Sequence, residues 1–105
     1  MTKKDLEQYK KQADIIKTAA TAKITQARTD IARWISPDNE NCKPYRLHFI
    51  GSKMQDTWYE YDKLAKACEK LNHAKPNEAP ALYSTITTAY EEIDSHAHSI
   101  NSLMK

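Results

Sequence analysis

The stretch LEQYKKQADIIKTAATAKITQARTDIARW (residues 6–34) decides the fold. Its apolar residues recur every three or four positions, a spacing that places them on one face of a helix. They are Leu6, Tyr9, Ala13, Ile16, Ala20, Ile24, Ala27, Ile31 and Trp34. Two successive steps of four meet at Ala20, so we expect this stripe to depart from a strict heptad, without sustained left-handed supercoiling. Because proline disfavours helical geometry at the preceding residue, Ser36-Pro37 ends the helix. The pattern predicts a helix over about residues 3–35, roughly 50 Å long.

Two further apolar stripes follow, and each begins at a proline that suits the first turn of a helix. After Pro44 the stripe contains Leu47, Ile50, Met54, Trp58, Tyr61, Leu64, Cys68 and Leu71, and after Pro80 it contains Leu82, Ile86, Ala89, Ile93, Ile100 and Leu103. These stripes predict helices over about residues 45–71 and 80–104. We expect Gly51, inside the second helix, to mark a close helix crossing.

The segments between the predicted helices are short and polar, at residues 36–43 and 72–79. Short connections make sequential helices antiparallel neighbours. The sequence therefore predicts an all-α protein, an antiparallel up-down-up three-helix bundle that forms a single domain over residues 1–105.

The composition agrees with this fold and argues against others. The chain has 105 residues, 40% hydrophobic and 29% charged, which favours a folded domain with a highly charged surface. A single glycine leaves almost nothing from which to build the tight turns of a sheet. No apolar run approaches the roughly 20 residues that span a bilayer, and the first residues do not read as a signal peptide. We expect a soluble, intracellular protein, cytoplasmic or nuclear.

The residue types that usually carry catalysis or bind cofactors do not form a recognisable site. His96 and His98 are two residues apart, so on a regular helix they point in nearly opposite directions and cannot bind one metal ion together. Cys68 falls on a buried stripe, whereas Cys42 lies in a connector and is expected to be exposed, too far from Cys68 for a disulfide. We predict that the protein is not an enzyme and uses neither a metal nor a cofactor.

Two surfaces of the first helix stand out as candidate interaction sites. One is a basic edge beside the apolar stripe, which comprises Lys3, Lys10, Lys17 and Arg28. The other is a threonine face on the side away from that stripe, with Thr18, Thr21, Thr25 and Thr29 beside Ala22 and Ala32. Threonine is only a moderate helix former, so propensity does not explain this choice, whereas small side chains let another helix approach closely.

These surfaces favour a non-enzymatic protein–protein interaction or assembly module, acting through self-association or a protein partner. The alternative is a small binding protein of phage or bacterial type that inhibits or regulates a macromolecular target through the basic edge. Nucleic acid is a further alternative partner for that edge, although no aromatic residue lies among its basic side chains to stack on bases.

Three segments together resemble the N-terminal helical region of Gag-like proteins from insect BEL/Pao-type retrotransposons. They are Arg28–Ile35, Met54–Tyr61 and Tyr90–Ile93. The resemblance implies a structural role in particle assembly through protein contacts. A smaller likeness joins Tyr90–Asp94 to the Y-x-x-x-D/E export signal of WXG-type secreted hairpins, which would imply export, although Trp34-Ile35-Ser36 lacks the glycine of that family's turn.

Overall fold

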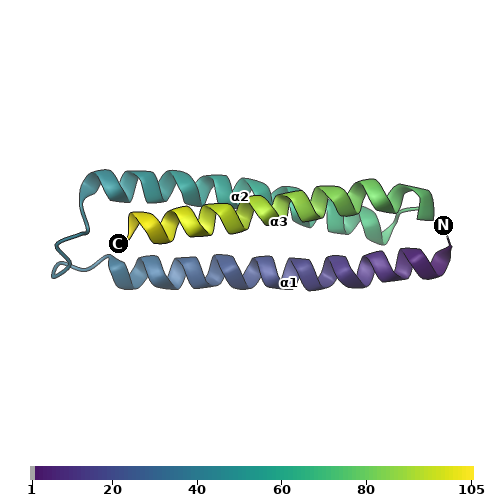
Figure 1. Cartoon of the computed structure of the whole chain (residues 1–105), viewed down its shortest axis with the longest axis horizontal. Coiled ribbons are helices and arrows are strands. Elements are labelled where there is room, and N and C mark those ends of the chain that lie inside the picture. The colour runs from purple at the N-terminus through teal and green to yellow at the C-terminus, as the bar shows by residue number, and fades with distance from the viewer. Residues whose placement is uncertain (1) are drawn as a thin grey trace.

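The computed structural model describes residues 2–105 as three long helices that lie side by side in a rod of 57 × 17 × 17 Å. They are α1 (Lys3–Trp34), α2 (Pro44–Asn72) and α3 (Ala79–Leu103), and the short 3₁₀ helix η1 (Pro76–Glu78) precedes α3. Successive helices run in opposite directions, as Figure 1 shows, and each helix packs against both others. The predicted all-α three-helix bundle is confirmed, and every predicted helix boundary lies within one residue of the observed one.

Local sequence signals explain where the helices begin and end. Thr2 caps α1 through a capping box, since its hydroxyl accepts a hydrogen bond from the Asp5 amide and the Asp5 carboxylate accepts one from the Thr2 amide. Helices α2 and α3 each have a proline in the first turn. At the end of α1, the Asn39 side chain donates a 2.8 Å hydrogen bond to the Trp34 carbonyl. This bond satisfies one of the carbonyls that a helix end leaves without a partner.

The core is built from one seven-residue series in each helix. In α1 the series is Leu6, Ala13, Ala20, Ala27 and Trp34; in α2 it is Ile50, Thr57, Leu64 and Leu71; in α3 it is Ala79, Ile86, Ile93 and Ile100. Every residue of these series is buried. The predicted departure from a heptad in α1 is the step of eight residues from Ile16 to Ile24, which lies beside this series. The series from Leu6 to Trp34 itself keeps its seven-residue spacing throughout.

The α1 series is rich in small residues, and the series of α2 and α3 are rich in large ones. Three of the five α1 positions are alanine, whereas leucine and isoleucine fill most positions in the other two helices. Alternating small and large side chains in this way fills a core at the density of protein interiors.

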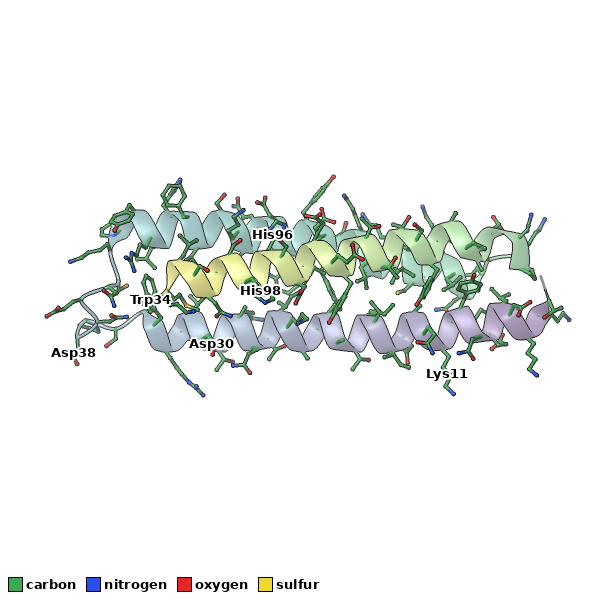
Figure 2. All side chains as sticks on the ribbon, in the orientation of Figure 1. Lys11, Asp30, Trp34, Asp38, His96 and His98 are labelled. Carbon is green, nitrogen blue, oxygen red and sulfur yellow. The ribbon has the colours of Figure 1, made fainter. Side chains whose placement is uncertain are left out.

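The buried residues form two separate clusters along the rod. The larger cluster, which we call the main core, contains Leu6, Ala13, Ala20, Ile24, Leu64, Ala67, Leu71, Ala79, Ile86, Ala89 and Ile93. The smaller cluster, the end core, contains Trp34, Ile50 and Ile100, next to the connector between α1 and α2. Figure 2 shows the Trp34 side chain at this end of the bundle, on the side of α1 that faces α3.

Two expectations for α2 are wrong. Trp58 was expected on the buried stripe but is 45% exposed, and its neighbour Thr57 is buried in its place. The heptad of α2 passes through position 57, so Trp58 falls one residue beyond it and packs edge-on against Tyr61, with ring centroids 5.8 Å apart. Gly51 does not mark a close crossing, since a Cβ added there would meet nothing within 4 Å.

Within residues 2–105, no helix combines the length and the apolar character that crossing a bilayer requires.

Candidate functional site

Most of the predicted threonine face lies on the outer side of α1. Thr18, Thr25 and Thr29 are exposed, as are the adjacent Ala22 and Ala32. The Thr29 hydroxyl donates to the Thr25 carbonyl one turn earlier, at 3.0 Å, so it is satisfied within its own helix. The side chains of this surface are short and uncharged.

Thr21 does not belong with the other three threonines. Its Oγ1 lies 3.0 Å from the hydroxyl oxygen of Tyr61 on α2 and also donates to the Lys17 carbonyl. The side chain therefore sits at the seam between α1 and α2, where it joins two helices of the bundle. The sequence placed Thr21 on the threonine face because its angular position on the helix lies at the border between the face and the seam.

Ile15 extends the outer face in the other direction. It is 54% exposed, an unusual setting for a large aliphatic side chain, and it lies off the buried stripe. With Ile15 in place of Thr21, the outer stripe becomes Ile15, Thr18, Ala22, Thr25, Thr29 and Ala32. These positions follow one another by three and four residues, which is the spacing of a helix–helix contact. The sequence contained a signal for this exposed position, because Ile15 lies next to Ile16 but is not part of the predicted apolar stripe.

The residues of the basic edge differ in their exposure to solvent. Lys3 and Arg28 are exposed. Lys10 and Lys17 are half-buried and line a groove between α1 and α2, whose opposite wall includes Asp62 and Glu69. On that wall Asp62 forms a 2.8 Å ion pair with Lys66 of its own helix, and on α1 Lys10 forms a 3.5 Å ion pair with Glu7.

An ion pair between Lys23 and Asp94 links the basic first helix to the acidic third helix. Their charged atoms are 2.8 Å apart, and the lysine also lies 5.8 Å from the centre of the Tyr90 ring. The hydrogen bond to Lys23 lowers the pKa of Asp94 and raises the pKa of Lys23. Both side chains remain more than a third exposed, so the pair contributes modestly to stability.

The two cysteines are free thiols in different parts of the core. Cys68 is half-buried beside the main core, where its Sγ lies 3.9 Å from the Ala13 carbonyl oxygen, and burial raises the pKa of its thiol. A raised pKa leaves little reactive thiolate at neutral pH. Cys42 was expected to be exposed, but it is half-buried against the end core, because the connector folds back over Trp34.

The histidines do not converge on a common site. Figure 2 shows His96 and His98 on different sides of α3, as their spacing predicts. The His98 Nδ1 lies 2.8 Å from the Asp94 carbonyl oxygen of its own helix. Among residues 2–105, no three His, Cys, Asp or Glu side chains come together in a way that could hold a metal ion.

The exposed aromatic residues of α2 are the surface feature that the sequence reasoning missed. Tyr45, Phe49 and Tyr59 are 59%, 52% and 64% exposed. All three lie off the predicted stripe of α2, and this offset was the available signal, because an aromatic residue outside the buried series of a helix must face solvent or a neighbouring surface.

Comparisons with known proteins give no match to the chain, whether to protein-family models, to curated proteins or to solved structures.

Proposed function

We propose that the protein is a non-enzymatic helical interaction module and that the outer stripe of α1 is its contact surface. The observation that carries the proposal is a second stripe on one helix. The same α1 that buries one line of residues in the core presents another, from Ile15 to Ala32, to solvent at the three- and four-residue spacing of a helix–helix interface.

The chemistry of the outer stripe favours a helix as the partner. Its six side chains carry no charge, and five of them are alanine or threonine, so a second helix can come close without burying an ion. Ile15 provides a large apolar side chain at one end. Pairing of α1 with α1 of a second copy would bury both stripes against each other. Assembly of this kind agrees with the structural role that the Gag-like resemblance implies.

The test is to place charge on the outer stripe and measure assembly. In Thr18→Glu/Thr25→Glu, the two carboxylates lie two turns apart on the stripe, and pairing would bury both of them. We expect the wild type to show concentration-dependent self-association by light scattering or sedimentation equilibrium, and the double variant to be monomeric.

A matched control uses two exposed threonines of α3. Thr85→Glu/Thr88→Glu adds the same charge to the same fold on another face, and Thr85 forms the same type of hydroxyl bond to its own helix as Thr29 does. This variant should assemble like the wild type. A wild type that stays monomeric at all concentrations would contradict self-assembly and would favour the alternative of a small protein that binds a different macromolecule.

A further inference from the structure

The first half of α2 combines positive charge with exposed aromatic rings. Between residues 41 and 55 the chain has Lys43, Arg46 and Lys53 and no acidic residue. Tyr45 and Phe49 lie one helical turn apart on the same face of α2, and more than half of each side chain is exposed. The acidic residues of α2 begin only at Asp56.

A groove with several hydroxyl groups runs beside Phe49. Phe49 and Lys53 of α2 form one wall, and Ser95, Ser99 and Ser102 of α3 line the other, together with His98. The three serines follow one another by four and three residues, so they share one face of α3. From residue 95 to residue 105 the chain has no acidic residue. Asp94, which precedes Ser95 in the sequence, is paired with Lys23 of α1, and Glu92 lies one helical turn before Ser95.

We propose that this surface, formed by Tyr45, Phe49, Lys53 and the serine face of α3, binds single-stranded nucleic acid. Hydroxyl and ammonium groups in the groove are donors suited to phosphate oxygens. Exposed aromatic rings near the Lys53 ammonium provide the stacking surface that unpaired bases require. The basic edge of α1 has cations but no rings, so the structure favours α2 and α3 for this role. The site lies apart from the outer stripe of α1 and does not depend on the proposed assembly.

An acidic peptide would also be attracted by the positive charge, but it has no use for two exposed rings on one face. Duplex nucleic acid would present phosphates, but its bases are stacked within the helix and cannot stack on Tyr45 or Phe49. Single strands are therefore the class of partner that uses both features of the surface.

The experiment measures fluorescence anisotropy of a short labelled oligothymidylate with the full chain at low and moderate salt. We expect salt-dependent binding that Tyr45→Ala/Phe49→Ala weakens by about tenfold or more, since each stacked base contributes measurably to affinity. Lys53→Gln should lower the slope of log affinity against log salt by about 0.7, the change expected for one lost phosphate contact to a single strand.

Tyr59→Ala is the matched control for the aromatic variant. Tyr59 is a more exposed ring on the same helix, but it lies among Asp56, Glu60 and Asp62, and its ring is covered by the Lys63 ammonium at 4.7 Å. This variant should bind like the wild type. Circular dichroism would verify that all variants keep their helical content.

Three outcomes would overturn the proposal. The first is no binding of the oligonucleotide at low salt. The second is equal loss of affinity in Tyr59→Ala and Tyr45→Ala/Phe49→Ala. The third is equally tight binding of a duplex or of a polyglutamate peptide, since either would show that the rings do not select unpaired bases.

Discussion

The main core and the end core differ in size and in their place along the bundle. The main core draws eleven buried residues from all three long helices, and the end core has three, at the end of the bundle where the chain turns from α1 to α2. The end core also contains the Trp34 Nε1, which is buried without a hydrogen-bond partner among residues 2–105, and large apolar side chains are exposed nearby in sequence, at Ile35, Tyr45 and Phe49. We therefore expect the main core to provide most of the stability; the surface proposed above to bind nucleic acid lies next to the end core.

The most direct way to test this comparison is to make the same substitution in each core. Ile93 and Ile100 lie two turns apart in the buried series of α3, and each is at most 1% exposed. We expect Ile93→Ala to lower the free energy of unfolding by about 4 kcal/mol and Ile100→Ala by about 2 kcal/mol, because a cavity near the bundle end can collapse more easily than one in the middle. Urea denaturation followed by circular dichroism would measure both values.

The difference between the two variants is the informative quantity, because residue type, helix and burial are held constant. An equal loss, or a larger loss for Ile100→Ala, would show that the end core is as tightly enclosed as the main core. Each variant should also unfold in a single transition, as is usual for a domain of this size.

How far the fold followed from the sequence can be judged at particular positions. The stripe from Leu6 to Trp34 and the prolines at 44 and 80 predicted three helices to within one residue, since periodicity and backbone geometry act locally. Trp58 was misplaced because it lies four residues after Met54 and three before Tyr61. Thr57 lies three residues after Met54 and four before Tyr61, so both positions fit a helical stripe equally well. Only the partner helices decide which of two adjacent residues faces the core, and size and hydrophobicity favoured the wrong one.

The candidate surfaces followed less well from the sequence. The threonine face was predicted from spacing within one helix, and all four of its threonines are exposed, whereas the contact between Thr21 and Tyr61, forty residues away, depends on how α2 packs against α1. The groove between Phe49 and the serines of α3 depends on the register of two helices, and a pattern within either helix contains no information about that register.

Thr57 lies between the two cores, and an apolar residue at this position would connect them. It is 2% exposed, lies between Ile50 and Leu64 in the α2 series, and donates a 2.7 Å hydrogen bond to the Lys53 carbonyl within its own helix. Thr57→Val keeps the shape and removes a buried hydroxyl, so we expect the free energy of unfolding to rise by about 1 kcal/mol. Thr57→Ala is the control for shape and should lower it instead, because it leaves a void. Denaturation in urea of both variants would measure the two effects, and a loss of stability in Thr57→Val would mean that the hydroxyl is needed there.

The smallest effect is expected at the contact between Lys23 and Asp94, which joins α1 to α3 on the surface of the bundle. The lowered pKa of Asp94 means that its contribution is present above the pKa of an unfolded aspartate, about 3.9, and is lost as the pH falls through the folded value. The raised pKa of Lys23 means that its contribution is present below the unfolded lysine value, about 10.4, and is lost as the pH rises through the folded value. We therefore expect Asp94→Asn to have a slightly lower thermal unfolding temperature than the wild type at neutral pH. The unfolding temperatures of the two proteins should converge in strong acid and in strong base.

Glu91→Gln removes one acidic charge from an exposed position of the same helix and is the control. A difference between Asp94→Asn and the wild type that persists unchanged in acid below the folded pKa of Asp94, where the aspartate is protonated in both states, would show that packing of the side chain and not its charge stabilises the contact.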